Sequence, residues 1–240
     1  MRAAPDAWTP RCYHTATKAV WVDPFRCFYR CPGVVEKIGG MSDGGKWVCG
    51  VDTLLQRSGC VVYSIGSAGK TSFEEAVLRH TACTVWAFDP TLDAATKAKV
   101  TTIAGLNFTS VGLSDVDGEQ VIGGVMRPVR TLRTLMRERG HAWIDVLKMD
   151  VEGSEWRVLD ALVQEGMPLP ATQAQIEFHL RPEHANVKPP AAIETLAGLS
   201  ALGMKVFHVE ENNYCPTCAG CLYELAFAHV DQAGALVTYS

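Results

Sequence analysis

Three ionisable residues lie close together in the segment 144–156, which reads IDVLKMDVEGSEW. Lys148 and Asp150 are two residues apart in an apolar run, so a strand would place them on one face, with Glu152 just beyond its end. Ionisable groups are rarely buried in an apolar strand without a function, because their desolvation is unfavourable. This segment is therefore the first candidate for catalytic chemistry. The structural alternative for Lys148 is an ion pair with Asp150 or Asp89.

Glu177 and His179 form a second candidate group in the run QIEFH at 175–179. A strand would place both side chains on one face, and a neighbouring strand would bring them to Asp150. Two carboxylates and an imidazole could hold Mg²⁺ or Mn²⁺, and the imidazole favours Mn²⁺. His179 could instead be a general base, because its pKa lies near neutrality, or a purely structural residue. The sequence leaves these roles of His179 open.

A glycine turn, Gly66-Ser67-Ala68-Gly69, follows another apolar run. It departs from the G-x-G-x-x-G dinucleotide fingerprint. Asp89 ends the next apolar run, where nucleotide-binding α/β folds use a carboxylate to hold a ribose diol. The turn and the carboxylate together indicate a nucleotide-type cofactor, either NAD or S-adenosylmethionine. The structural alternative is that Asp89 caps a helix beginning near Thr91.

Short apolar runs that alternate with helical segments are expected to position these residues. The pattern predicts strands at Val61–Ile65, Thr84–Asp89, Leu106–Val111, Val146–Asp150, Gln175–His179, Lys205–Glu210 and Leu222–His229, and helices at about 71–80, 91–103, 129–139, 153–165 and 190–202. The fold class is α/β: a Rossmann-like seven-stranded, mostly parallel sheet with helices on both faces and a C-terminal antiparallel hairpin. Ligands bind at the carboxyl ends of such strands, where the candidate residues lie.

Length and composition support one large domain. The chain has 240 residues, of which 48% are hydrophobic and 20% charged, and its net charge is −4. This composition excludes global disorder and disfavours a strongly basic nucleic-acid binder. Residues 1–50 are rich in proline and glycine and are expected to form an irregular N-terminal extension packed on a main domain at 51–240.

Targeting signals are not evident in the chain. No apolar run reaches the length of a membrane span, and residues 1–20 lack the apolar stretch of a signal peptide. The sequence therefore predicts a soluble chain without a membrane span.

Nine cysteines are more than a cytosolic enzyme of this size needs. Cys60 and Cys83 lie beside expected strands and are interpreted as small buried hydrophobic residues. Cys215, Cys218 and Cys221 have metal-like spacing, but three thiolates are one ligand short of a closed zinc site. Disulfides between this loop and the N-terminal extension are favoured over zinc, and they would suit the secretory pathway.

The sequence resembles the class I S-adenosylmethionine-dependent methyltransferases, specifically the FkbM-type and methyltransferase-like-24 group. The resemblance spans roughly residues 27–229, and its longest block is 144–156. The shorter blocks are Tyr63–Gly66, Ser72–Glu75, Phe88–Pro90, Gly112–Ser114, Ile176–His179 and Cys221–Leu225.

This resemblance implies which residues hold the cofactor and which act on the acceptor. The cofactor would contact Ser64, Gly66, Ser67, Glu75, Asp89, Pro90, Leu113 and Ser114, with Glu75 replacing the acidic residue that many relatives place before the glycine turn. Asp150 would lie beside the transferred methyl group. Asp150, His179 and Lys148 are the catalytic candidates, and Asp150, Glu177 and His179 are the candidate metal ligands.

The predicted function is S-adenosylmethionine-dependent O-methylation of a sugar hydroxyl in a glycan or glycoside, assisted by Mn²⁺ or Mg²⁺. The alternatives are a protein or small natural product as acceptor, a non-catalytic binding module with the same fold, and a nicotinamide oxidoreductase, which the missing fingerprint disfavours. The expected partner is a carbohydrate or another small hydroxyl-bearing acceptor and not a nucleic acid. The Golgi lumen or the extracellular space is favoured over the cytoplasm.

Overall fold

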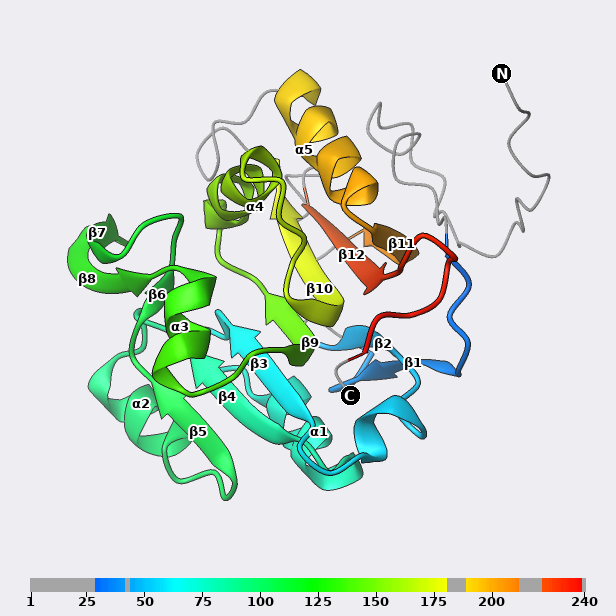
Figure 1. Cartoon of the computed structure of the whole chain (residues 1–240). Helices are drawn as coiled ribbons and strands as arrows, with labels where there is room; N and C mark the ends of the chain where they lie inside the picture. Colours follow the sequence, from blue (N-terminus) through cyan, green and yellow to red (C-terminus); the bar gives the residue numbers. More distant parts are fainter. Residues whose placement is uncertain (1–28, 42–43, 181–188, 212–221, 239–240) are drawn as a thin grey trace.

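A seven-stranded sheet forms the centre of the molecule, with the strand order β11-β12-β10-β9-β3-β4-β5 (Figure 1). The computed structural model describes residues 29–41, 44–180, 189–211 and 222–238. The strands are β3 (Val61–Ile65), β4 (Thr84–Phe88), β5 (Leu106–Thr109), β9 (Ile144–Met149), β10 (Ala171–His179), β11 (Met204–Glu211) and β12 (Leu222–His229). β12 runs antiparallel to both β10 and β11, whereas the pairs from β10 through β5 are parallel. The predicted Rossmann-like sheet with a C-terminal antiparallel hairpin is confirmed.

The order of strands reverses between β3 and β9. From β3 the chain builds outward to β4 and β5 and then returns to β9 on the other side. Ligands of such sheets bind at this switch point, beyond the carboxyl ends of the strands. In the parallel pair of β3 and β9, Ile65 is the register partner of Met149. Gly66 and Asp150, which follow these two residues, therefore emerge side by side.

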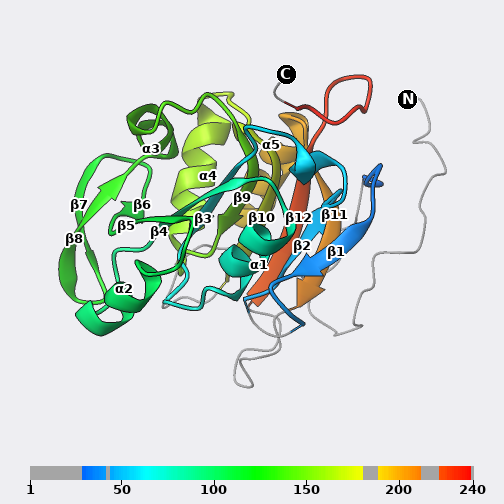
Figure 2. The ribbon, with the colours of Figure 1, turned by 90° about the horizontal axis from the view of Figure 1, so that it is seen from below.

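Within the described residues, five α-helices cover the two faces of the sheet, as predicted (Figures 1 and 2). They are α1 (Ser72–His80), α2 (Ala94–Val100), α3 (Leu132–Glu138), α4 (Ser154–Gln164) and α5 (Pro189–Ala201). Buried residues of α3, α4 and α5 form one core with β9 and β10, whereas α1 and α2 pack on the opposite face of β3 and β4. The strands are apolar on both faces because both faces are covered.

A small second sheet was not expected from the sequence. It contains β6 (Gly112–Leu113), β7 (Gly118–Ile122) and β8 (Val125–Arg130) in the order β6-β8-β7. The helix predicted from residue 129 begins only at Leu132, because Thr131 caps it by accepting a hydrogen bond from Thr134 N–H. The sheet lies beside the carboxyl ends of β4 and β5 and brings Leu113 towards the switch point.

The expectation of an irregular segment through residue 50 is wrong for its last part. β1 (Val35–Ile38) and β2 (Lys46–Cys49) pair as an antiparallel hairpin. The hairpin contacts β10 and β12 on the face that α1 covers elsewhere. Gln173 of β10 anchors it, because its side-chain amide donates to the Cys49 carbonyl and accepts from the Cys49 N–H. Periodicity does not predict this hairpin, because each strand has only four residues and the connection between them is rich in glycine. The proposed boundary between residues 50 and 51 stays a prediction.

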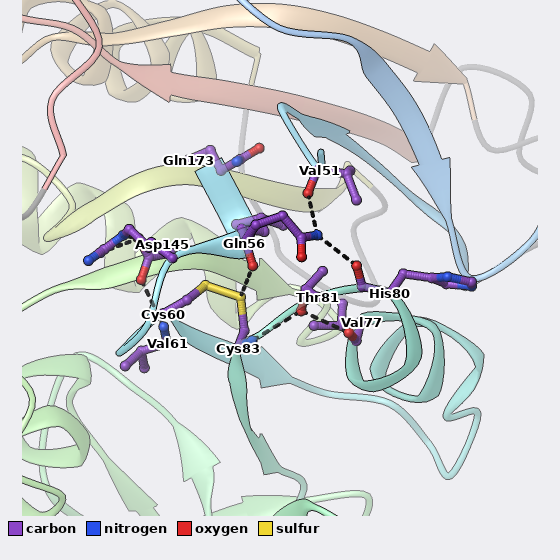
Figure 3. Close-up of a disulfide and its surroundings, with 12 residues drawn as sticks. Val51, Gln56, Cys60, Val61, Val77, His80, Thr81, Cys83, Asp145 and Gln173 are labelled. Atoms are coloured by element: carbon purple, nitrogen blue, oxygen red, sulfur yellow. Dashed lines mark hydrogen bonds and ion pairs between the residues drawn. A yellow bond between two sulfur atoms is a disulfide. The ribbon is translucent and has the colours of Figure 1, made fainter. Parts of the chain in front are cut away.

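Two disulfides lie within the described residues, Cys31–Cys49 and Cys60–Cys83. The second corrects the interpretation of Cys60 and Cys83 as free buried thiols. Their strands β3 and β4 are adjacent and parallel, so the residues just before each strand meet (Figure 3). Beside this disulfide, the Gln56 amide donates to the carbonyls of Val51 and His80. The disulfide therefore joins two loops at the end of the sheet opposite the switch point.

Two sequence-based expectations concern other parts of the chain. Cys215, Cys218 and Cys221 lie outside the described residues, so their pairing stays a prediction. Across the part of the chain that the structure describes, no helix is both long and apolar enough to cross a membrane.

Candidate active site

A pocket of about 360 Å³ opens at the switch point, which is a volume typical of small-molecule and cofactor sites. One side of the pocket, here called the glycine side, is formed by Gly66, Ser67, Asp89, Pro90 and Leu113. The other side, here called the acidic side, contains Asp150, Glu152, Glu177 and His179, with Lys148 at the junction. Residues from five separate segments thus meet where the sheet topology predicts a ligand.

Asp89 organises the glycine side. One carboxylate oxygen accepts hydrogen bonds from the backbone N–H groups of Ser67 (3.0 Å) and Ala68 (2.8 Å). The other accepts from the N–H and hydroxyl of Thr91 at 2.8 and 2.6 Å. Asp89 therefore ties the glycine turn to the end of β4. The helix-cap alternative is wrong for Asp89, because α2 begins at Ala94 and Asp93 caps it by accepting from Thr96 N–H.

Gly66 allows the backbone of the turn to approach the end of β9. Its φ is +76°, and a Cβ atom added there would lie 1.6 Å from the carbonyl oxygen of Asp150. Only glycine fits this position without a large shift of backbone. This close approach brings the glycine side and the acidic side together in one pocket.

Lys148 has a structural contact that sequence reasoning did not foresee. Its side chain is 2% exposed, and its ammonium group donates to the carbonyl oxygen of Gly66 at 2.5 Å. The partners considered from sequence were the carboxylates of Asp150 and Asp89. The contact instead fixes the glycine turn from the β9 side, while Asp89 fixes it from the β4 side.

His179 is held in one orientation by Glu155 at the start of α4. Oε1 of Glu155 accepts from the backbone N–H of His179 (2.8 Å) and lies 3.2 Å from its ring Nδ1. Oε2 accepts from the Gly153 N–H at 2.8 Å. Trp156 adds a bond from its indole N–H to the His179 carbonyl. With Nδ1 engaged, Nε2 is the nitrogen that faces Asp150 and Glu152.

Asp150, Glu152 and His179 converge at the acidic side. Each residue offers one ligand atom, and the three atoms lie within 4.8 Å of one another. His179 Nε2 is 3.3 Å from Glu152 Oε2 and 4.0 Å from Asp150 Oδ1. Glu152 has a φ of +52°, unusual for a residue other than glycine, asparagine or aspartate. This strained conformation turns the Glu152 carboxylate back towards His179, and such strain is common at functional sites.

The charges around His179 favour its protonated form. Burial lowers the pKa of His179, but hydrogen bonds to Glu152 and Glu155 and their negative charges outweigh burial and raise it to about 10. An imidazolium cannot accept a proton, so this environment does not favour His179 as a general base.

Glu177 lies on the pocket wall but outside the converging set. Its neighbours are Lys46 of β2, 3.7 Å away, and Glu224, its register partner on β12. Burial raises the pKa of Glu177 to about 8, reinforced by the negative charges of Asp150 and Glu224. Sequence reasoning named Glu177 as the third metal ligand, whereas in the structure Glu152 supplies the third converging ligand atom.

Three predicted cofactor contacts lie outside the pocket lining. The Ser64 hydroxyl donates to the buried carboxylate of Glu74. Glu75 accepts from the Thr71 hydroxyl and is half-exposed on α1. Ser114 is buried and bonded to Asp115 and Gln120. These side chains have partners within the protein, whereas Ser67, Pro90 and Leu113 do line the pocket.

Sequence reasoning missed two residues that shape the acidic side. No role is predicted for Glu155 from the sequence, although its place at the start of the expected helix 153–165, just before Trp156, could have indicated burial. Lys46 gave no local signal, because its partners are more than 130 residues away in the sequence.

The fold and the site together define a Rossmann-like methyltransferase domain. A family model described as "Methyltransferase domain" matches residues 2–227, so the chain belongs to this methyltransferase family. The probable methyltransferase-like protein 24 of Homo sapiens is 28% identical over 129 residues, or 52% of this chain and 34% of that protein. The Rattus norvegicus protein is 30% identical over 124 residues, covering 50% of this chain and 33% of its own length. The chain thus spans about a third of these relatives, and the predicted methyltransferase-like-24 resemblance is confirmed.

Solved structures with a similar fold are more distant in sequence. The Methanococcus jannaschii fibrillarin pre-rRNA processing protein is 14% identical, with a TM-score of 0.45, covering 74% of this chain and 69% of that chain. Fibrillarin from Aeropyrum pernix, solved with bound S-adenosylmethionine, is 10% identical with a TM-score of 0.44, covering 72% and 68%.

Proposed function

We propose that this chain is an S-adenosylmethionine-dependent O-methyltransferase that methylates a hydroxyl group of a carbohydrate, with a divalent cation held by Asp150, Glu152 and His179. The proposal rests on one observation: the glycine side and the acidic side, which differ in chemistry, face the same pocket. The glycine side suits a nucleoside-type cofactor, and the acidic side suits a cation and a polyhydroxyl acceptor.

The glycine side fits S-adenosylmethionine in shape and in polarity. Gly66 lets the backbone of the turn pack closely against the end of β9 at the pocket, and Asp89 and Lys148 hold the turn from two directions. Pro90 and Leu113 supply apolar surface for an adenine ring. When bound, this cofactor supplies an electrophilic sulfonium methyl group. We assign Asp89 to the ribose side of the pocket.

The acidic side fits a hard or borderline divalent cation. Two carboxylates and one imidazole are oxygen and nitrogen ligands that suit Mn²⁺ or Mg²⁺. Glu155 engages Nδ1 of His179, which leaves Nε2 directed at the cluster, and a bound cation would take the place of the proton that the surrounding carboxylates favour on Nε2. Metal-binding histidines usually have such a carboxylate or carbonyl partner on the other ring nitrogen. A cation at this position would supply Lewis acidity, which lowers the pKa of a coordinated hydroxyl.

The residues of the chain contribute mainly by positioning. Methyl transfer is an in-line displacement, so the acceptor oxygen must be held about 3 Å from the methyl carbon. Asp150 lies next to Gly66 at the junction of the two sides of the pocket, so we assign it to orient the acceptor hydroxyl. Buried residues of β3, β9 and β10, among them Ile65, Lys148 and Glu177, line this part of the pocket.

We also propose an oxidising compartment, the secretory pathway or the extracellular space. Two disulfides lie within the described residues, and such bonds persist mainly in oxidising environments.

A methyl-transfer screen tests the proposal. The protein is incubated with labelled S-adenosylmethionine and a panel of glycans and glycosides, with Mn²⁺, with Mg²⁺ or after EDTA treatment. We expect label in a glycan, dependent on the cation. Asp150→Asn should lose transfer, whereas the control Asp160→Asn on the outer part of α4 should retain it. Label only in RNA or protein, or equal transfer after EDTA, would contradict the proposed acceptor or metal.

A further inference from the structure

Three glutamates lie in one row across the antiparallel strands next to the pocket. Glu224 of β12 is the register partner of Glu177 on β10 and of Glu210 on β11. Like charges directly opposite one another destabilise a sheet. The row therefore needs positive charge from another element.

Hairpin β1–β2 supplies two lysines to this row. Lys46 forms a short contact with Glu224 and lies 3.7 Å from Glu177. Lys37 donates to both carboxylate oxygens of Glu210, at 2.8 and 2.9 Å. Lys46 thus pairs with Glu177 and Glu224, the two glutamates nearer the pocket. Lys37 pairs with Glu210, which does not line the pocket.

Lys46 is buried more completely than its role in a surface hairpin would require. Its side chain is 1% exposed, and burying a lysine is unfavourable unless it is paired. The strand that carries it is fixed at its other end by the Cys31–Cys49 disulfide and by the bidentate Gln173 contact. The chain therefore holds this ammonium group firmly beside Glu177.

We propose that Lys46 is a positioning residue for the acceptor: its ammonium group holds the carboxyl group of Glu177 at the pocket wall, where Glu177 contacts the acceptor. Hairpin β1–β2 is then a part of the catalytic site, and Gly44, at its turn, also lines the pocket. This inference rests on the proposed function, because it assigns Glu177 to the acceptor.

Lys46→Met, Lys46→Arg, Glu177→Gln and the matched control Lys37→Met test the inference. Crystal structures of the complexes with S-adenosylhomocysteine give the first readout. We expect the Glu177 carboxyl group to leave the pocket wall in Lys46→Met and to stay in Lys46→Arg and Lys37→Met. The dissociation constant of S-adenosylhomocysteine should change less than about twofold in all four variants.

Kinetics with an acceptor from the glycan screen give the second readout. Misplacement by about 1 Å can slow an enzyme 100-fold, so Lys46→Met should lose about 10- to 100-fold in kcat/KM for the acceptor. The double variant Lys46→Met/Glu177→Gln should be no slower than either single variant, and Lys46→Arg should recover part of the loss.

Two results would overturn the inference: an unmoved Glu177 in Lys46→Met, or an equal loss in Lys37→Met. If Lys46→Met does not fold, Glu224→Gln replaces it. That variant keeps Lys46 beside Glu177. It should therefore retain the position of Glu177 and the acceptor kinetics, and loss of either one would also overturn the inference. Failure of the proposed function is distinguishable, because wild-type protein would then not bind S-adenosylhomocysteine or would transfer no methyl group to a glycan, whatever the position of Glu177.

Discussion

Glu155 holds His179 at two points, the backbone N–H and the ring Nδ1, at 2.8 and 3.2 Å. Glu155 is completely buried, and its other oxygen accepts from Gly153 N–H at the start of α4. One carboxylate thus sets both the orientation of the imidazole and the turn that carries Glu152. The geometry of the acidic side depends on this residue, although Glu155 does not line the pocket.

Glu155→Gln should weaken Mn²⁺ binding about 10- to 100-fold, the usual effect of removing the partner of a metal-binding histidine. The amide keeps one acceptor oxygen for the backbone but loses the charge that fixes the ring. Titration of Mn²⁺ followed by calorimetry measures the effect. Glu165→Gln, in an exposed pair with Arg133, is the control and should bind Mn²⁺ like wild type. Equal affinities in the two variants would exclude this role of Glu155.

Asp89→Asn should weaken binding of S-adenosylhomocysteine by about 1–3 kcal/mol, or roughly 5- to 150-fold. Asparagine has one acceptor oxygen, so its NH₂ group would face N–H donors of the turn or of Thr91. Asp93→Asn is the matched control, because asparagine caps a helix as well as aspartate does. Calorimetry of both variants measures the difference. An unchanged dissociation constant in Asp89→Asn would remove Asp89 from the cofactor site.

Gly66→Ala should abolish binding of S-adenosylhomocysteine and destabilise the fold, because the new Cβ would lie 1.6 Å from the Asp150 carbonyl oxygen. Gly59→Ala is the matched control: Gly59 has the same φ of +76° but no heavy atom within 4 Å of the added Cβ. The control should cost only about 1 kcal/mol of left-handed strain. Thermal unfolding and calorimetry separate the two effects. A stable Gly66→Ala protein with normal binding would contradict the close approach of the two strand ends.

Stability should fall as the pH is lowered from about 6.5 to 4, in part because of His208. Burial lowers the pKa of His208 to about 4, and Lys37 contributes while Glu210 opposes the shift. The unfolded state binds the proton first in this window, so protonation favours unfolding by at most about 3 kcal/mol. His208 stacks on Trp47 of the hairpin. Urea unfolding at several pH values should show a shallower dependence in His208→Gln, and an unchanged slope would exclude His208 as a cause.

The central sheet was predictable because its signals are local. Apolar runs such as Val61–Ile65 and Leu222–His229 match β3 and β12 residue for residue. Gly66 and Asp89 could be predicted to meet because the carboxyl ends of adjacent parallel strands must lie together. Asp150 and His179 could be predicted to meet for the same reason, because they lie at the carboxyl ends of the adjacent parallel strands β9 and β10.

The remaining parts depend on contacts between distant segments. Lys46 acquires its role only when β2 packs on β10 and β12, and nothing near Lys46 in the sequence indicates those partners. Cys60 and Cys83 resembled buried hydrophobic residues because each lies beside an apolar strand, and only the pairing of β3 with β4 brings their sulfur atoms together. Glu152, and not Glu177, converges with Asp150 and His179 because of the turn at Glu152, and periodicity cannot predict the positive φ of that turn.

Calorimetric titration with S-adenosylhomocysteine tests the central claim most directly, with NAD as the control ligand and with each titration repeated in EDTA and in Mn²⁺. We predict binding of S-adenosylhomocysteine and not of NAD, together with Mn²⁺ binding that Asp150→Asn removes. Binding of NAD alone would contradict the methyltransferase function. If neither ligand binds, the chain would be a non-catalytic binding module with a methyltransferase fold, which would also contradict the proposed function.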